Sequence, residues 1–251
     1  MAPVTDETYL HRVVALLTAF AGDENAVTPT ELAHRVGLPK STVHRIVASL
    51  VEEGLLERHA AQVRLGLLLF EIGQRVPRQR VLRDAARPYM HDLREATRQT
   101  VHLAILEGSQ VVYVDILASP GSPPLPSRVG GRFPAHVTGV GKAMLAFSPP
   151  ETVSAVLGGD LPRVSQRSTT APGLLAKELA TIRETGVAYD HEESRPGIVC
   201  AASPALGGNG EVLGALSVCG WSSRIRLDHV ALAVRTAALA LSRTLGHPGP
   251  K

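Results

Sequence analysis

Apolar positions in the first part of the chain recur at helical spacing in three short segments separated by polar breaks. The first stripe consists of Leu10, Val13, Val14 and Leu17. The second segment begins after Thr28, because Thr28, Pro29 and Glu31 have the pattern of a capping box, and it ends at Gly37. The third stripe ends at Gly54 and consists of Val43, Ile46, Val47, Leu50 and Val51. The spacing predicts three helices, each with one buried face.

The second and third of these helices lie on either side of a Gly-Leu-Pro break in ELAHRVGLPKSTVHRIVASLVEEG, residues 31–54. In a helix-turn-helix, the second helix crosses the third closely enough to brace it in the DNA major groove. Ala33 permits such close contact, and Gly37 can adopt a left-handed turn. Val43 and Ile46 then close a small core. By itself, this stretch leaves open an ordinary helical hairpin with a solvated basic face.

A short β-hairpin is predicted directly after Gly54. The stretch LLERHAAQVRLG places apolar residues around a small-residue tip and carries Arg58 and Arg64. A hairpin behind a recognition-like helix is where a winged domain makes its phosphate contacts, although a surface hairpin without a partner is the alternative. The following stretch, LLLFEIGQRVPRQR, is apolar and then basic, and Pro77 interrupts it. We therefore expect a boundary near residue 79, which gives one domain over 1–79 and a second over 80–251.

The second domain has a mixed pattern. After a helix expected over about 81–98, TVHLAILEG and QVVYVDILA alternate as the strands of a hairpin. Further helices are expected through GVGKAMLAF, from SPPE with Ser148 and Glu151 at cap positions, over about 172–185, and near the end of the chain. Strand-like runs flank GGNG. The pattern predicts an α+β fold for this domain.

The Asn209-Gly210 pair predicts which residues of the last two strands face each other. If these two residues form a two-residue hairpin turn, Cys200 lies directly opposite Cys219, and Ser217 points to the same face. Three small polar side chains then converge. A face of small core residues is one alternative. A cross-strand disulfide is the other, and the reducing cytoplasm and the geometry of such a bridge disfavour it.

Composition and charge narrow the class of protein. Apolar residues make up 44% of the chain and charged residues 20%, which is globular. No apolar run approaches the ~20 residues of a membrane span, and MAPVTDETYL lacks the features of a signal peptide, so we expect a cytoplasmic protein. The net charge of +3 is a weak bias towards nucleic acid. The local distribution of charge is a stronger indication of nucleic-acid binding, because no acidic residue lies between Glu31 and Glu52, where Arg35, Lys40 and Arg45 occur.

Catalytic and metal-binding interpretations have little support in the residues. GVGK lacks the first glycine of a phosphate loop and the Ser or Thr after the lysine. Cys200 and the 10 histidines form no local pattern of a thiol enzyme, and no Cys/His group has zinc spacing. We expect no enzyme activity, metal or cofactor. A small-molecule sensor or thiol-dependent enzyme without DNA binding remains the alternative to a DNA-binding regulator.

The chain resembles the IclR family of bacterial transcription regulators from about residue 8 to 245. Five stretches carry the resemblance in order: ELAHRVGLPKSTVHRIVASLVEEGLLER, VRLG, HVTGVGKAMLA, YDHEESRPGIVCAASP and LGALSVCGWSSRI. The resemblance implies a winged helix-turn-helix joined by a linker helix to a GAF-like (profilin-like) α/β effector domain. It also implies a homodimer, or a tetramer formed as a dimer of dimers, that binds double-stranded DNA at a palindromic operator. The hairpin ERHAAQVRLG departs from the family, since it lacks an Asp/Gly tip.

The candidate DNA contacts come from the exposed turns of the third helix, from the second helix and from the hairpin. They are Thr30, Lys40, Ser41, Thr42, His44, Arg45, Arg58 and Arg64. The resemblance further implies an effector site lined by Gly139, Val140, Asp190, Cys200, Ser217 and Cys219. Gly139 and Val140 open a predicted helix, whose N–H groups offer a positive dipole end to an anion. Asp190 would repel a carboxylate unless it is protonated or accepts a hydroxyl from the ligand. We therefore expect a small hydroxy-, keto- or aromatic acid as the effector that modulates operator binding.

Overall fold

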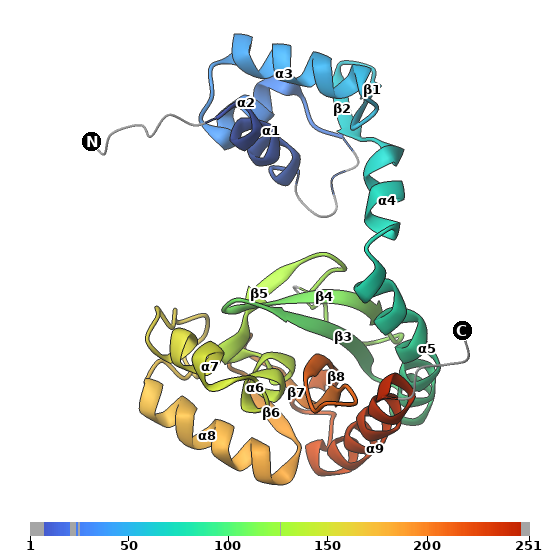
Figure 1. Ribbon diagram of the computed structural model, residues 1–251, viewed down its shortest axis with the longest axis vertical. Coiled ribbons are helices and arrows are strands. Elements are labelled where there is room, and N and C mark those ends of the chain that lie inside the picture. The colour runs from blue at the N-terminus through green and yellow to red at the C-terminus, as the bar shows by residue number, and fades with distance from the viewer. Residues whose placement is uncertain (1–7, 21–23, 25, 126, 247–251) are drawn as a thin grey trace. The chain divides into compact units, whose positions relative to one another are not determined.

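The computed structural model describes residues 8–20, 24, 26–125 and 127–246 (Figure 1). Contacts divide the chain into two compact units, Met1–Pro77 and Arg78–Lys251, and each is described by itself. Within the described part of the chain, no helix is both long and apolar enough to cross a membrane.

The described residues of the N-terminal unit form three helices, a two-stranded hairpin and a fourth helix: α1 Tyr9–Thr18, α2 Pro29–Val36, α3 Lys40–Glu52, β1 Leu56–His59, β2 Gln62–Leu65 and α4 Leu67–Gln74. The expected N-cap of α2 is confirmed, because Thr28 Oγ1 accepts the Glu31 N–H at 3.1 Å. The rest of the expected capping box is not, since the Glu31 carboxylate accepts from Arg35 Nε at 3.0 Å instead of reaching back. Gly37 ends α2 with φ 68°, the left-handed conformation expected from the sequence.

The apolar faces of α1, α2 and α3 meet in one core, which β1 and β2 complete through Leu56 and Val63. The predicted stripe of α1 is wrong in part, because Leu10 and Val14 are exposed and the buried residue of this helix is Leu16. The predicted hairpin is confirmed, with Leu56 opposite Leu65 and His59 opposite Gln62. Its tip has no glycine, and Ala60 takes the left-handed conformation there with φ 53°. This unit is therefore a helix-turn-helix followed by a wing.

The C-terminal unit is built on one six-stranded antiparallel sheet in the order β5-β4-β3-β8-β7-β6. Its elements are α5 Pro77–Thr97, β3 Thr100–Glu107, β4 Gln110–Leu117, β5 Arg132–Pro134, the 3-10 turn η1 Ala135–Val137, α6 Gly139–Ala146, α7 Pro150–Leu157, α8 Pro172–Thr185, β6 Ala188–His191, β7 Ile198–Leu206, β8 Val212–Trp221 and α9 Leu227–Gly246. The mixed α+β pattern expected from the sequence is confirmed.

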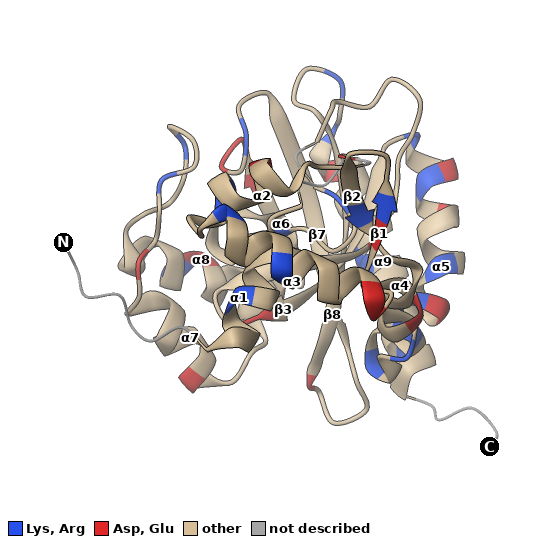
Figure 2. Ribbon diagram, turned by 90° about the horizontal axis from the view of Figure 1, so that it is seen from above, with Lys and Arg blue, Asp and Glu red and all other residues tan. Residues whose placement is uncertain are grey.

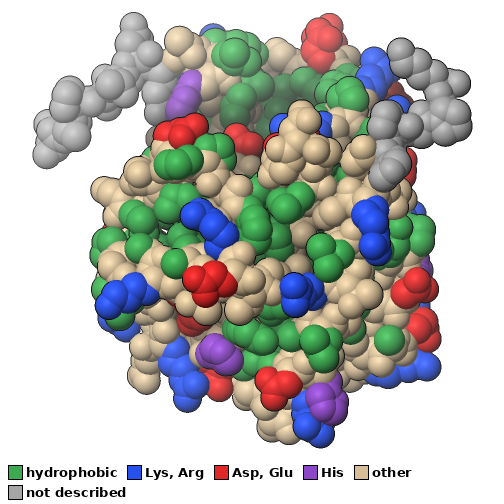
Figure 3. Space-filling view, turned by 60° about the horizontal axis from the view of Figure 1, so that its bottom comes forward, with side chains coloured by type: hydrophobic (Ala, Val, Ile, Leu, Met, Phe, Trp, Pro, Cys, Tyr) green, Lys and Arg blue, Asp and Glu red, His purple; other side chains and the backbone are tan. Residues whose placement is uncertain are grey.

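Helices cover both faces of this sheet, and the alternation of side chains along the strands decides what each face meets. Val101 and Leu103 of β3 pack with α5 and α9 in one apolar cluster. Ala104 of β3 and Ala215 of β8 pack on the other side with α6, α7 and α8. Charged and apolar side chains are interspersed over the face of the molecule seen in Figure 3.

Two local predictions in this unit are wrong. Helix α7 begins at Pro150 with Pro149 at the N-cap, and the Ser148 hydroxyl donates to the Met144 carbonyl at 2.9 Å rather than capping α7. The β7–β8 turn is also longer than two residues. The Gly210 N–H bonds to the Gly207 carbonyl, and Gly210 takes φ 78°, which is a type I turn followed by a left-handed glycine.

The pairing of Cys200 with Cys219 is nevertheless confirmed. The longer turn shifts the register by one residue, and an irregularity between Ala205 and Leu206 shifts it back. The predicted pairing was therefore right although the predicted turn was wrong.

Candidate effector pocket and nucleic-acid interface

Helix α3 presents a polar face opposite its buried one. Val43, Ile46 and Val47 are buried, while the expected contact residues of α3 are exposed or, for Thr42, half-buried. Thr30 of α2 is exposed beside them. Among the described side chains none caps the start of α3, where Pro39 is the N-cap. The first N–H groups of the helix are therefore available to an anion such as a phosphate.

Two basic side chains of this unit, Arg35 and Arg64, form ion pairs with acidic side chains. Arg35 donates to Glu24 at 2.6 Å and to Glu31 at 3.0 Å, and these hydrogen bonds raise the pKa of its guanidinium. Arg35 therefore links α2 to the segment before it. Arg64 of the wing donates to Glu57 at 2.7 Å, which lowers the pKa of that carboxyl and cancels much of the arginine's charge.

The remaining positive charge of the candidate interface lies on Lys40, Arg45 and Arg58, whose side chains are exposed. Figure 2 marks lysine and arginine on α3 and on the β1–β2 hairpin in blue. Of the two wing arginines, Arg58 is thus the stronger candidate for a phosphate contact, because Arg64 has an acidic partner within its own hairpin.

The C-terminal unit contains a partly open pocket on the α6 side of the sheet, lined by both polar and apolar side chains. All six residues expected at an effector site line it, namely Gly139, Val140, Asp190, Cys200, Ser217 and Cys219. The structure adds residues from β3, β4, β5, β7, the N-cap of α6 and two loops: His102, Tyr113, Leu125, Ser127, Phe133, Thr138, Ser194, Arg195 and Ile198. The cavity of about 30 Å³ has room for a few water molecules, so its walls must move to admit an organic ligand.

The start of α6 forms one wall of the pocket. Thr138 is its N-cap and accepts the Gly141 N–H at 3.1 Å, which leaves Gly139 and Val140 as the first two helical residues. Their N–H groups have no intrahelical acceptor, so they suit a carboxylate. A Cβ on Gly139 would lie 3.3 Å from that of Ala202, so the helix start packs tightly against β7 here. A Cβ on Gly141 would overlap the Ala135 backbone, which accounts for the second glycine of GVGK by packing.

Asp190 organises the loop after β6. One carboxylate oxygen accepts the Glu193 N–H at 2.7 Å, and the other accepts the Ser194 hydroxyl at 2.5 Å. The side chain is buried, and burial raises its pKa to about 6, although these hydrogen bonds favour the charged form. Most of its acceptor capacity is thus already used within the protein. With a pKa of about 6 the Asp190 carboxyl is still mostly ionised at neutral pH, so the expected repulsion of a ligand carboxylate near it remains.

Lys142 belongs to the support behind the pocket rather than to its lining. Its side chain is 0% exposed, and its Nζ donates to Glu178 of α8 at 2.6 Å and to Glu193 at 2.5 Å. The lysine of GVGK therefore joins α6, α8 and the loop that Asp190 organises. A buried lysine held by two carboxylates is a structural ion cluster, which sequence reasoning could not recognise without the fold.

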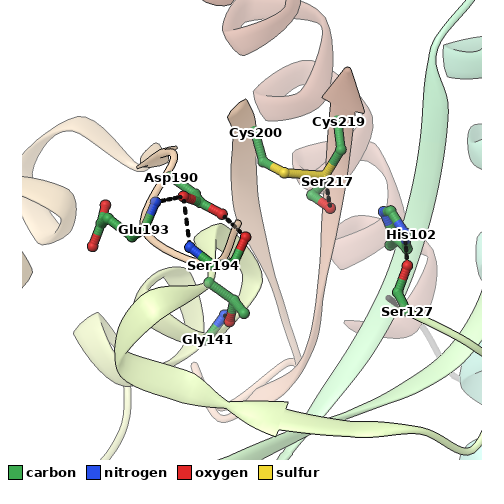
Figure 4. Close-up of a disulfide and its surroundings, with 10 residues drawn as sticks. His102, Ser127, Gly141, Asp190, Glu193, Ser194, Cys200, Ser217 and Cys219 are labelled. Atoms are coloured by element: carbon green, nitrogen blue, oxygen red, sulfur yellow. Dashed lines mark hydrogen bonds between the residues drawn. A yellow bond between two sulfur atoms is a disulfide. The ribbon is translucent and has the colours of Figure 1, made fainter. Parts of the chain in front are cut away.

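The two cysteines form a disulfide, so the expectation of free thiols is wrong. Directly opposite residues on neighbouring antiparallel strands bring the two sulfurs within bonding reach, and here the Cα atoms are 4.2 Å apart. In Figure 4 the disulfide lies beside Ser217, whose Oγ is 3.7 Å from the Cys219 sulfur. Of the three converging polar side chains expected from the sequence, only Ser217 thus keeps a full hydrogen-bonding capacity.

Sequence reasoning missed the polar wall opposite Asp190. His102 of β3 lies directly across from Ser217 of β8, and its Nε2 is 2.8 Å from Ser127 Oγ. Burial lowers the pKa of His102 to about 4, so the ring is neutral. Tyr113 lies 5.2 Å from His102 between ring centroids, and burial raises the pKa of its hydroxyl. The alternation in TVHLAILEG could have placed His102 on one face, but nothing in the sequence said which face meets the pocket.

A winged helix-turn-helix unit and an α/β unit with a small pocket together define a ligand-responsive DNA-binding regulator. Comparison with known families agrees: residues 10–60 match the IclR helix-turn-helix domain, and residues 74–243 match the bacterial transcriptional regulator IclR C-terminal domain. The chain therefore belongs to the IclR family of bacterial transcriptional regulators.

Several characterised proteins are similar over nearly the whole length. The HTH-type transcriptional regulator XynR of Escherichia coli is 32% identical over 95% of this chain and 97% of its own length. The acetate operon repressor of Salmonella typhimurium is 31% identical over 100% of this chain and 94% of its own length. The crystal structure of an IclR homologue complexed with 4-hydroxybenzoate, from Microbacterium hydrocarbonoxydans, has a TM-score of 0.88 at 31% identity and covers 95% of this chain and 99% of that one.

Proposed function

We propose that this regulator binds a small aromatic or hydroxylated monocarboxylic acid in the pocket of its C-terminal unit, and that this binding changes its affinity for a palindromic DNA operator. The observation that carries the proposal is the start of α6 at the pocket wall. There Gly139 and Val140 offer two N–H groups to an anion, and the approach of Ala202 leaves little space for any side chain at residue 139. The similar structure that holds 4-hydroxybenzoate supports an acid of this class.

The N-terminal domain, which we assign to residues 1–79, would bind the operator through α3 and the wing. Lys40, Ser41, Thr42, His44 and Arg45 would enter the major groove region, with Thr30, Arg58 and Arg64 at the flanking phosphates. The exposed polar face of α3 and its uncapped start support this assignment. The ion pair of Arg64 with Glu57 makes it the weakest member of the set.

Within the effector domain, residues 80–251, the sheet connects the ligand pocket to the N-terminal helix of the domain. The strands that line the pocket, β3 and β8, carry His102 and Ser217 on one face and Leu103 and Leu216 on the other. The second face packs against α5, which begins at Pro77. Because the cavity is smaller than an aromatic acid, binding has to displace part of its lining, and we propose that β3 and β8 are among the parts that shift and so move the support of α5.

Calorimetry with benzoate and hydroxybenzoates, with gel shifts in parallel, tests this function. Ser217→Ala should weaken binding of the acid by about 1 kcal/mol, the scale of one hydrogen bond. Gly139→Pro removes one N–H at a position where helices tolerate proline, and Gly139→Ala adds a Cβ while keeping that N–H. We expect the proline variant to bind more weakly than the alanine variant. If no aromatic acid binds, or if all three variants match the wild type, the pocket assignment is wrong.

A further inference from the structure

His102 is the most deeply buried titratable side chain that lines the pocket without a full set of hydrogen bonds. It is 2% exposed, and its Nε2 is paired with Ser127 Oγ at 2.8 Å. Its Nδ1 has no partner among the described residues. A buried polar atom without a partner is costly, typically by more than a formed hydrogen bond returns, so such an atom in a binding pocket points to a ligand group.

The position of His102 complements that of α6. In Figure 4, His102 and Ser127 stand on one side of the site, with Asp190, Ser194 and Gly141 on the other side of Ser217. The α6 wall offers N–H donors to an anion, whereas the β3 wall offers a neutral imidazole and a hydroxyl. A ligand that satisfies both walls therefore carries one carboxylate and, away from it, one neutral hydrogen-bonding group.

The tautomer of His102 can adapt to that neutral group. In a neutral imidazole one nitrogen donates and the other accepts, and the Ser127 hydroxyl can take either role towards Nε2. Nδ1 can consequently accept from a ligand hydroxyl or donate to it. A second carboxylate would place a further negative charge in the pocket, and the neutral imidazole cannot balance it, because burial opposes the charged imidazolium.

We propose that His102, through Nδ1, is a specificity-determining residue that hydrogen-bonds a hydroxyl group on an aromatic monocarboxylate effector. This inference rests on the proposed function and adds to it a chemical selection. The pocket favours a hydroxylated aromatic acid over the unsubstituted acid, in which Nδ1 stays unpaired. A site built to bond a hydroxyl rejects an analogue without it more strongly than an apolar pocket rejects a missing methylene.

The test uses two substitutions that separate the two ring nitrogens. Asparagine carries its polar atoms near the position of Nδ1, and glutamine carries them near that of Nε2. His102→Asn thus keeps a partner for the ligand and loses the Ser127 contact, whereas His102→Gln does the reverse. His102→Phe removes both. Calorimetry on the full-length variants, checked for folding by thermal unfolding, measures dissociation constants for benzoate, 3-hydroxybenzoate, 4-hydroxybenzoate and 1,4-benzenedicarboxylate.

In the wild type we expect at least one hydroxybenzoate to bind about tenfold or more tightly than benzoate, the effect of one well-placed hydrogen bond, and the dicarboxylate no more tightly than benzoate. The ratio of the benzoate dissociation constant to the hydroxybenzoate dissociation constant should largely survive in His102→Asn. It should fall to near one in His102→Gln and His102→Phe, while the benzoate dissociation constant stays within a few-fold of the wild-type value.

Three outcomes overturn the inference. A preference kept in His102→Gln and lost in His102→Asn would mean that His102 acts only by holding Ser127. Equal binding of benzoate and both hydroxybenzoates to the wild type would mean that no hydroxyl is read, and the proposed function would still stand. Failure of every aromatic acid to bind would remove the proposed effector class together with this inference.

Discussion

Two buried side chains of the pocket, Asp190 and His102, respond to pH in opposite directions. Burial raises the pKa of Asp190 from 3.8 to about 6, so its contribution to stability is present below pH 3.8 and is lost as the pH rises through 6. Burial lowers the pKa of His102 from 6.5 to about 4, so its contribution is present above pH 6.5 and is lost as the pH falls through 4. Between about pH 4 and 6 the two effects offset each other.

Replacing Asp190 with a residue that does not titrate should reveal the pH dependence of stability that His102 contributes. Asp190→Asn keeps an acceptor for the Glu193 N–H but no longer titrates, so the fall in unfolding free energy between pH 6.5 and 4 should be steeper than in the wild type by about 3 kcal/mol. Urea unfolding at a series of pH values measures this. The double variant Asp190→Asn/His102→Phe should have a flatter profile than Asp190→Asn alone. Identical profiles for wild type and Asp190→Asn would contradict the assigned shift.

The disulfide gives a second prediction at the scale of single residues. It closes a loop with a sequence separation of 19, for which the chain-entropy model gives about 3 kcal/mol of stabilisation. Dithiothreitol should therefore lower the urea midpoint of the wild type. It should leave the midpoint of the double variant Cys200→Ala/Cys219→Ala unchanged. A wild-type midpoint that does not respond to the reductant would count against the bond.

Among the elements, α3 and α6 each place the start of a helix at a candidate site, but they differ in what surrounds it. Helix α6 is buried along all eight residues and capped by Thr138. Helix α3 is buried on one face only, and no described side chain caps it. A buried helix start suits a small enclosed anion, whereas an exposed one suits a phosphate of a large partner.

The exposed cations of α3 should dominate the salt dependence of operator binding. Lys40→Ala and Arg45→Ala should each weaken binding and reduce the slope of log affinity against log salt by about 1, if each contacts a phosphate. A change of Arg45 that instead relaxes preference at one base pair would indicate a base contact. Gel shifts over a salt series measure both, with Lys177→Ala, an exposed residue of α8, as the charge-matched control. Unchanged slopes would remove α3 from the interface.

For the whole molecule, the exposed apolar side chains of the N-terminal unit support assembly. Leu67 and Phe70 of α4 are each 62% exposed, and Tyr9 and Leu10 of α1 are more than half exposed. Large apolar side chains gathered on short helices suit contact with a second copy, and a two-fold operator requires two such units. We expect the chain to sediment as a dimer or larger at micromolar concentration.

The substitution Phe70→Ser tests that assembly. It should shift the sedimentation towards monomer and weaken operator binding together, because the two half-sites then bind separately. The control is Leu174→Ser, at an exposed apolar position of α8 in the C-terminal unit. Phe147 is unsuitable as a control position, because it packs against the core of that unit. Specific binding by a wild-type monomer would contradict the dimer.

The sequence by itself determined the elements whose cause is local. The stripes of α2 and α3, the left-handed Gly37, the β3–β4 hairpin and the span of α8 all follow from spacing and turn chemistry within a few residues. The six residues expected at an effector site, which the structure brings together around one pocket, were also named from the sequence, because the family motifs carry them. Tertiary structure alone decided three features. Whether the cysteines bond depends on sulfurs brought together from two strands, and the partners of Lys142 come from a distant helix and loop. The role of His102 depends on which face of the sheet meets α6, which strand alternation leaves open.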